Sequence, residues 1–471
     1  MSRSPSTSLY TQLVTSTLFP LHERLKKHHS VAMLAELERS QWLPPEQLAA
    51  LQAQELQKFI ADLATNNPYY SAIFDELNIT AKDISCAADL VKLPFLTKSD
   101  IHDNQQALRS TEAGKLLKYN TGGSSGEPLI FYMGMDRVSH DVAAKWRATR
   151  WWDVDIGDVE AVIWGSPIEL GKQDYVKLLR DRLFRSHLIP AFDLHPVKIS
   201  SYLQRLSELH PAMVFGYPSV IHQLALAATK QGIPLNTLGV KVVFTTSEML
   251  YPHQREIIEQ AFAAPVANGY GARDAGFIAH ECPQGSMHIS AEQLVVEIID
   301  DQGNPCQAGQ EGEIVVTHMA TRGFPFVRYQ TGDMGTLSSI PCPCGRGLPV
   351  MQEVQGRATD FITATDGAKV HALALIYILR EMPSIEQFKV IQLGSQQIQI
   401  QIKANSQFED SALRDMETAM KQRLGQDMQV DVVKLNHFPT TKNGKFRYVE
   451  DRTVSPHLDS TLTDIRQTDA Q

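Results

Sequence analysis

The sequence predicts a large α/β N-terminal domain, whose sheet layers are covered by helices, followed by a small α+β C-terminal domain. Three observations support this fold class. The chain has 471 residues, which is too long for one compact core. Short β-rich runs alternate with helical stretches between about 115 and 320. After about Gly356 the pattern changes to an alternating strand, a helix and another strand.

In the N-terminal part, the first predicted helix covers about 44–63 and is stopped by NNPYY. Its apolar positions recur at helical spacing: Leu48, Leu51, Leu56, Phe59, Ile60 and Leu63. Further along, β-branched runs predict strands, and one amphipathic run predicts a helix between them. The strand runs are AVIWGS, VVFTT, LVVEIID and EIVVT, and the helix is PHQREIIEQAF.

In the C-terminal part, QIQIQIKA from Gln397 alternates with period two, which indicates a strand buried on one face. A helix is expected over 410–424, with Gly425 as its cap, and MQVDVVKL predicts the next strand. The last twenty residues are polar and lack periodicity. We therefore expect domains over 1–356 and 357–455, with a disordered tail over 456–471.

Composition limits the class of protein. The formal net charge of −9, from 53 acidic and 44 basic side chains, argues against a nucleic-acid partner. The longest apolar run, VHALALIYIL, is about half the length of a membrane span. The N-terminus lacks the apolar core of a signal peptide. Five cysteines make no even disulfide framework, so we expect a cytoplasmic protein.

The stretch YNTGGSSGEP, residues 119–128, has two interpretations. Gly and Ser are the usual residues of tight turns, so it is compatible with a plain hairpin. Small residues also free backbone N–H groups to surround a phosphate. It is not a Walker A loop, because Glu127 stands where that motif needs Lys.

Four further segments follow in order: NGYGARDAG (268–276), RYQTGD (328–333), GRATD (356–360) and PTTKNGKFR (439–447). An aromatic residue between two glycines, such as Tyr270, can lie flat against a purine, and Asp274 can reach a metal. Asp333 offers two acceptor oxygens to a ribose diol. Taken alone, NGYGARDAG is also compatible with a Gly-rich surface loop, and PTTKNGKFR with a solvated charged loop.

Together, the five segments resemble the motif series of the adenylate-forming acyl- and aryl-CoA synthetase superfamily. Other runs are similar to the phenylacetate–CoA ligase branch, including relatives associated with capsular polysaccharide synthesis. These runs are LPFLTKSDI, FGYPSVIHQLA, TSEML, AHEC and CPCGRGLP. The resemblance covers about 42–452.

The resemblance implies an ATP-dependent, AMP-forming carboxylate ligase that makes an acyl-adenylate and passes the acyl group to CoA. Transfer to a carrier-protein thiol, or to a sugar amine or other amino group in surface polysaccharide synthesis, is the alternative. A degenerate nucleotide-binding protein without turnover is a third reading. The implied ligands are a small carboxylic acid, ATP, Mg²⁺ and CoA, with no nucleic acid and no membrane span, and a homodimer is left open.

The same resemblance implies the site residues. Lys445 would bridge the substrate carboxylate and the α-phosphate, and the mobile small domain would carry it in and out. Asp274 stands where the superfamily usually has Glu, the Mg²⁺ ligand, and Thr359 stands at the expected hinge in place of Asp or Lys. The nucleotide would contact Thr121, Gly122, Gly123, Ser124, Ser125, Gly126, Glu248, Gly269, Tyr270, Gly271, Asp333 and Arg357.

Substrate selection is the least determined part. The resemblance puts Tyr217, Pro218 and Ala272 at the acyl pocket. The tryptophans at 146, 151, 152 and 164 are more typical of core or lid positions than of substrate contacts.

Cysteine and histidine side chains suggest a structural zinc site. Three thiols and one imidazole satisfy tetrahedral Zn²⁺. The expected ligands are Cys282, Cys342, Cys344 and His288, with His288 preferred over His280. A Gly/Pro-rich turn that merely contains cysteines is the alternative, and Cys86 and Cys306 are expected to be ordinary thiols.

Overall fold

The computed structural model describes residues 8–121, 129–164, 175–190, 196–355, 361–435 and 449–451. The N-terminal helices are α1 (Leu9–Leu13), the π-helical turn η1 (Val14–Leu18), α2 (Phe19–Leu25), α3 (Ser30–Ser40), α4 (Pro45–Asn66), α5 (Pro68–Leu77) and α6 (Lys98–Asp103), with 3-10 turns at Ala81–Asp83 and Ala87–Lys92. A small hairpin, β1 (Leu117–Asn120) and β2 (Ile130–Met133), precedes helix α7 (Met135–Arg150).

A sheet of eleven strands forms the body of the large domain, counted over the described residues. Its first half holds the parallel strands β3 (Glu160–Trp164), β4 (Ser186–Pro190), β5 (Met213–Gly216), β6 (Val242–Thr246) and the start of β7 (Val266–Ala272). The helices of this half are α8 (Tyr175–Leu183), α9 (Pro196–Leu209), α10 (Pro218–Gln231) and α11 (Pro252–Phe262), with a 3-10 turn at Leu235–Thr237. Strands β5 and β6 are fully buried, as expected of parallel strands under helices.

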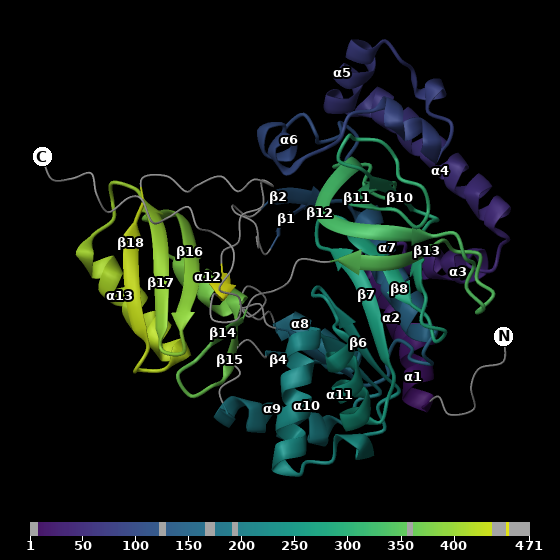
Figure 1. Ribbon diagram of the computed structural model, residues 1–471. Helices are drawn as coiled ribbons and strands as arrows, with labels where there is room; N and C mark the ends of the chain where they lie inside the picture. The colour runs from purple at the N-terminus through teal and green to yellow at the C-terminus, as the bar shows by residue number, and fades with distance from the viewer. Residues whose placement is uncertain are drawn as a thin grey trace, which may run out of the picture.

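The second half of this sheet is antiparallel. It continues from β7 through β8 (Gly276–Glu281), β9 (Met287–Ile289), β13 (Val350–Gln355), β12 (Phe326–Ser338), β11 (Glu311–His318) and β10 (Leu294–Ile299). Helix α4 lies along this half in Figure 1, and its apolar stripe shares one core with residues of β10, β11 and β12. The predicted helix over 44–63 is confirmed, and it ends at Asn66 because Asn67 and Pro68 start α5.

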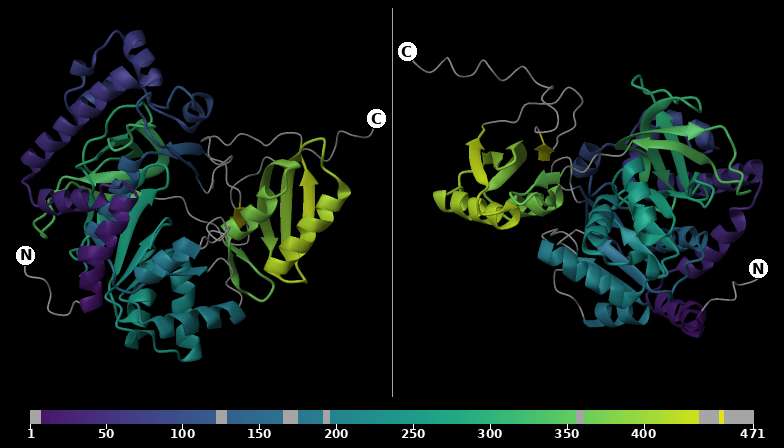
Figure 2. Two further views of the ribbon diagram at one scale, coloured as in Figure 1. Left: turned by 180° about the vertical axis from the view of Figure 1, so that it is seen from behind. Right: turned by 60° about the horizontal axis from the view of Figure 1, so that its bottom comes forward.

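The small domain has its own core. It comprises β14 (Phe361–Thr363), β15 (Lys369–His371), α12 (Ala372–Arg380), β16 (Ile385–Gly394), β17 (Gln397–Ala404), α13 (Asp410–Leu424), β18 (Gln429–Lys434) and β19 (Val449–Asp451). Figure 2 shows it from two sides as a separate body. In β17 the isoleucines at 398, 400 and 402 are buried and the glutamines between them are not, so the period-two prediction is confirmed. The predicted helix over 410–424 is also confirmed.

The predicted fold class is therefore confirmed. The proposed boundary at 356/357 and the tail over 456–471 lie outside the described residues. No helix in the described ranges is long and apolar enough to cross a membrane.

Candidate active site

The candidate site lies where the parallel strands end. Strands β3, β5, β6 and β7 run side by side in one direction, so their carboxyl ends meet at one edge, the usual ligand-binding edge of such sheets. Trp164 ends β3, and its ring stacks on Tyr217, which follows β5, at 4.5 Å and 28°. Glu248 follows β6, and its Oε2 accepts a 3.3 Å hydrogen bond from Ser219 N at the start of α10. This edge therefore brings the predicted pocket residues Tyr217 and Pro218 beside Glu248.

Tyr270 and Asp333 meet although 63 residues separate them. The Tyr270 hydroxyl on β7 donates to Asp333 Oδ2 on β12 at 3.0 Å. Burial, reinforced by the Asp333 carboxylate, raises the pKa of Tyr270 well above its usual value, so the phenol remains a neutral donor. Gly332 turns the chain with a φ of +78°, and Asp333 N donates to Thr331 Oγ1 at 3.1 Å. Two of the predicted nucleotide contacts are thus held together in one place.

Asp274 is held from several directions. The Tyr329 hydroxyl donates to its Oδ2 at 2.5 Å, and Ala275 N donates to its Oδ1 at 3.1 Å. Arg137 Nη1 donates to the Asp274 carbonyl at 3.1 Å. The Asp274 side chain is buried, and each carboxylate oxygen keeps a further lone pair. A hard oxygen donor fixed in this way suits Mg²⁺.

The hydroxyl-rich stretch begins at Thr121, and its residues Gly122 to Gly126 lie outside the described part of the chain. Its base is a hairpin, because Thr121 N donates to Leu129 O and Leu129 N donates to Thr121 Oγ1, both at 3.0 Å. Arg273 Nη1 donates to Asn120 O at 3.3 Å and ties this hairpin to the loop that carries Asp274. The paired strands β1 and β2 therefore flank the stretch, and its described end at Thr121 lies next to the candidate site.

Close backbone approach explains two predicted glycines. A Cβ on Gly269 would lie 2.9 Å from Phe244 Cε1, and one on Gly271 would lie 2.4 Å from Gly276 O. The second contact is with backbone, which cannot swing aside. Ala272, which ends β7, is half-buried against the core of the antiparallel half. Gly269 and Gly271 therefore set the backbone on either side of Tyr270, and they need not touch a ligand to be required.

The cysteine and histidine side chains predicted as zinc ligands come together. The ligand atoms of Cys282, His288, Cys342 and Cys344 all lie within 4.8 Å of one another. Cys282 Sγ is 3.6 Å from Cys342 Sγ, and Cys344 Sγ is 3.3 Å from His288 Nε2. His280 lies elsewhere, stacked on Phe277 at 5.4 Å. Three sulfurs and one imidazole nitrogen within this span fit a tetrahedral Zn²⁺.

The protonation states of this cluster also suit a metal. Burial lowers the pKa of His288 to about 4, so its imidazole is neutral at pH 7 and can ligate. His288 Nδ1 lies 3.3 Å from Leu348 O, which orients the ring so that Nε2 faces Cys344. Burial raises the pKa of Cys282 to about 12, so this thiol would release a proton on binding a metal.

Sequence reasoning missed the surroundings of this cluster. The Trp151 ring lies edge-on to His288 at 5.7 Å, and Arg346 Cζ lies 4.5 Å from the centre of the Trp151 ring. Trp151 Nε1 and Arg346 Nε both donate to Gln41 Oε1 after helix α3, at 2.8 and 3.1 Å. The loop that carries Cys342 and Cys344 therefore connects the N-terminal helices to the sheet, which is a structural role.

A second cluster that the sequence did not indicate, formed by Arg137, His140, Asp141 and His318, lies beside the backbone of Asp274. Arg137 Nε donates to both carboxylate oxygens of Asp141, and the His140 and His318 rings lie 4.9 Å apart beside this pair. Burial, together with Arg137, lowers the pKa of His318 well below its usual value. His140, Asp141 and His318 offer metal-ligand atoms within 4.8 Å of one another, but Arg137 already neutralises the carboxylate. The group is best understood as a buried support for the Asp274 loop.

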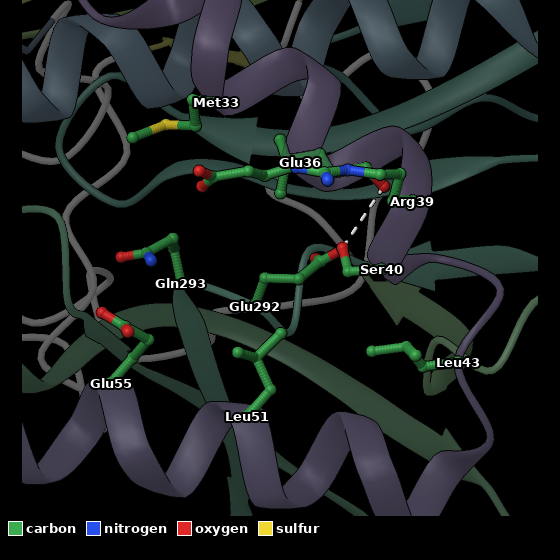
Figure 3. A pocket seen from close by; sticks show the side chains of 10 residues that line it. Met33, Glu36, Arg39, Ser40, Leu43, Leu51, Glu55, Glu292 and Gln293 are labelled. Carbon is green, nitrogen blue, oxygen red and sulfur yellow. Dashed lines mark hydrogen bonds between the residues drawn. The ribbon is translucent and has the colours of Figure 1, made fainter.

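A separate cavity of about 320 Å³ lies between α3 and α4 (Figure 3). Glu292 reaches its wall, and Glu292 Oε1 accepts hydrogen bonds from Ser40 Oγ and Arg147 Nη1, both at 2.7 Å. None of the residues predicted for nucleotide, acyl or metal binding lines this cavity, so it is not the predicted acyl pocket.

The remaining predicted residues, Arg357, Thr359 and Lys445, lie outside the described residues, and their roles stay predictions.

The chain is similar in sequence to known proteins over most of its length. The family described as the CapK C-terminal domain matches residues 362–452. CapK of Staphylococcus aureus is 25% identical over 405 residues, which cover 85% of this chain and 88% of that protein. A phenylacetate–coenzyme A ligase of Thermus thermophilus is 24% identical over 360 residues, covering 73% and 77%.

Solved structures share the architecture. A 2-hydroxyisobutyryl-CoA ligase, crystallised with 2-HIB-AMP and CoA in the thioesterification state, matches with a TM-score of 0.63 at 20% identity, over 88% of this chain and 91% of the other. The same enzyme in its postadenylation state matches with a TM-score of 0.60 at 20% identity, over 88% and 92%. The resemblance found in the motifs is therefore confirmed: the chain is a homologue of CapK and the phenylacetate–coenzyme A ligases, with the fold of the adenylate-forming CoA ligases.

Proposed function

We propose that this protein is an ATP-dependent, AMP-forming carboxylate–CoA ligase. A carboxylate oxygen attacks the α-phosphorus of ATP, and pyrophosphate leaves. The CoA thiol, losing its proton, then attacks the acyl carbon, and AMP leaves with the former carboxylate oxygen. The observation that carries the proposal is the hydrogen bond between Tyr270 and Asp333, which joins two motifs at the ligand-binding edge of the sheet. The names of the homologues support the same reaction class.

In this proposal Tyr270 stacks on adenine and Asp333 accepts hydrogen bonds from the ribose hydroxyls. The Tyr270–Asp333 hydrogen bond fixes both groups before the nucleotide arrives, which reduces the ordering cost of binding. The hairpin loop that starts at Thr121 donates to the β- and γ-phosphates. Lys445 neutralises the repulsion between the carboxylate and the α-phosphate.

Mg²⁺ would be held at Asp274 and would offset the charge of the phosphates. This chain contributes the orientation of that carboxylate, because Tyr329 and Ala275 each occupy one of its oxygens. Zn²⁺ would be held by Cys282, His288, Cys342 and Cys344, where it would fix the loop against Trp151 and Gln41. A cytoplasmic location is also proposed, supported by five cysteines that form no disulfide.

The acyl group is proposed to lie between Tyr217 and the β7 loop. The Trp164–Tyr217 stack makes this wall aromatic and apolar, and Tyr217 itself is buried. Glu248 beside it is anchored at the start of α10. A pocket with these walls suits a compact, largely apolar acid rather than a long polar one.

A pyrophosphate-release assay over a panel of carboxylic acids, with and without CoA, tests the proposal. We expect one class of acid to give ATP-dependent release that CoA accelerates, and Asp333→Ala to abolish it. An acyl-AMP that accumulates regardless of CoA would indicate a different acceptor, such as a carrier-protein thiol or an amine. No release from any acid, together with no binding of ATP by calorimetry, would contradict the enzyme assignment.

A further inference from the structure

The N-terminal helix carries leucines on its outer surface. Helix α1, the π-helical turn η1 and helix α2 follow one another without a break from Leu9 to Leu25. Leu9, Leu13, Leu21 and Leu25 are 84%, 47%, 55% and 76% exposed. They lie at every fourth position of the segment, except that position 17 is a threonine. We call these four leucines the leucine face. Four large apolar side chains in solvent on one short segment are unusual.

The π-helical turn aligns this face. A side chain four residues on in an α-helix is rotated by about 40° around the axis, because a turn takes 3.6 residues. In a regular α-helix, leucines at every fourth position would therefore rotate progressively around the axis, and they could not all face one flat surface. The turn at Val14–Leu18 holds an extra residue and rotates the helix back. The leucines before it and after it then point to the same side.

The opposite side of the helix is fixed to the large domain. Val14 and Phe19 are buried in a core with Leu34, Leu37 and Ile156. Thr15 Oγ1 donates to Ile156 O at 2.7 Å, and the Tyr10 hydroxyl donates to Leu183 O at 2.9 Å. The four leucines are therefore exposed although the opposite side of the helix packs against the large domain.

The charge around the leucine face is basic, although the whole chain carries −9. Between residues 8 and 29 the only acidic side chain is Glu23, which is buried. Arg24, Lys26 and Lys27 are exposed at the end of the helix. The neighbouring helix α8, which Tyr10 contacts, adds two exposed leucines and one exposed arginine: Leu179, Leu183 and Arg182.

We propose that the leucine face docks this protein onto the surface of an anionic lipid bilayer. An amphipathic helix with leucines on one side and lysine or arginine beside them lies in the plane of the membrane interface. Apolar contact and a basic cluster together give the two signals that stable membrane anchoring requires. A second copy of the chain fits less well, since a helix of this length offers roughly 250 Å², well under the roughly 800 Å² per partner of a stable interface.

Flotation of the full-length protein with lipid vesicles tests the proposal. One set of vesicles is phosphatidylcholine alone, and the other is phosphatidylcholine and phosphatidylglycerol in equal parts. The test variant is Leu21→Gln with Leu25→Gln, the charge variant is Lys26→Gln with Lys27→Gln, and the matched control is Leu226→Gln with Ile340→Gln. The control leucine and isoleucine are also exposed, at 41% and 75%, but lie elsewhere. Thermal unfolding midpoints verify that every variant is folded.

We expect the unmodified protein and the control variant to float with the anionic vesicles. The leucine variant should bind at least about tenfold more weakly, and the lysine variant should lose the preference for anionic over neutral lipid. Failure of the unmodified protein to float with anionic vesicles would overturn the proposal. Equal binding by the leucine variant would do so too. A dimer that the leucine variant turns into a monomer, with no vesicle binding by either, would show instead that the face joins two copies.

Discussion

Removal of the Tyr329 hydroxyl should loosen the carboxylate that we assign to the metal. Tyr329 is fully buried, its hydroxyl lies 2.5 Å from Asp274 Oδ2, and Asp274 itself is 6% exposed. A hydrogen bond to a charged group contributes about 1.5–3 kcal/mol, and Tyr329→Phe removes it without changing the ring. For a domain of roughly 350 residues the entropy of unfolding is about 0.7 kcal/mol/K, so we expect the unfolding midpoint to fall by roughly 2–4 °C.

The same change should also affect function. Because Asp274 loses one of the two groups that orient it, Tyr329→Phe should require more Mg²⁺ for half-maximal adenylation, while the KM for the carboxylic acid stays the same. The assays are differential scanning calorimetry and pyrophosphate release over a range of Mg²⁺ concentrations. Tyr132→Phe is the matched control, since Tyr132 is half-buried and its hydroxyl has no hydrogen bond within the described residues. Equal midpoints and equal Mg²⁺ dependence for Tyr329→Phe and the control would contradict an orienting role for the Tyr329 hydroxyl.

Four other changes give further tests. Lys445→Ala should slow adenylation by on the order of 10²–10³ while sparing thioester formation from supplied acyl-AMP, measured by single-turnover kinetics; equal loss in both steps would contradict the assigned role. Cys342→Ser should lower the zinc content of purified protein and its unfolding midpoint, and unmodified protein with less than about 0.2 zinc per chain would refute the site. Gly271→Ala should destabilise by about 1–3 kcal/mol in urea unfolding, because its Cβ would lie 2.4 Å from Gly276 O, and an unchanged midpoint would contradict this contact. Burial lowers the pKa of His280 to about 3, so between pH 6.5 and 3 the unfolded state binds one more proton than the folded state, and the free energy of unfolding falls as pH falls. His280→Asn should flatten this decline, and an unchanged slope of unfolding free energy against pH would contradict the prediction.

Local patterns were predictable because they depend on neighbouring residues. The alternation in QIQIQIKA and the apolar stripe of α13 gave the right elements with the right bounds, since each pattern already contains the face that the core buries. The chemistry of the cysteines and His288 likewise predicted a cluster that the structure brings together. Here the preference for His288 over His280 agrees with the geometry, because His280 lies among aromatic rings instead.

Contacts between distant residues were not predictable from single motifs. Nothing in the local sequence around Tyr329 indicates that its hydroxyl meets Asp274, 55 residues away. The same holds for Arg137, which reaches the Asp274 carbonyl from a helix 137 residues earlier. Trp164 was expected in the core or in a lid, and only the pairing of β3 with β5 brings it onto Tyr217. Sheet order decides these contacts, and a single sequence does not contain it.

A structure of the protein bound to ATP and Mg²⁺ would show directly whether the nucleotide lies between Tyr270 and Asp333. We predict that the purine lies against the ring of Tyr270 and that both ribose hydroxyls contact the Asp333 carboxylate. A nucleotide bound anywhere other than the carboxyl edge of β3, β5, β6 and β7 would contradict it.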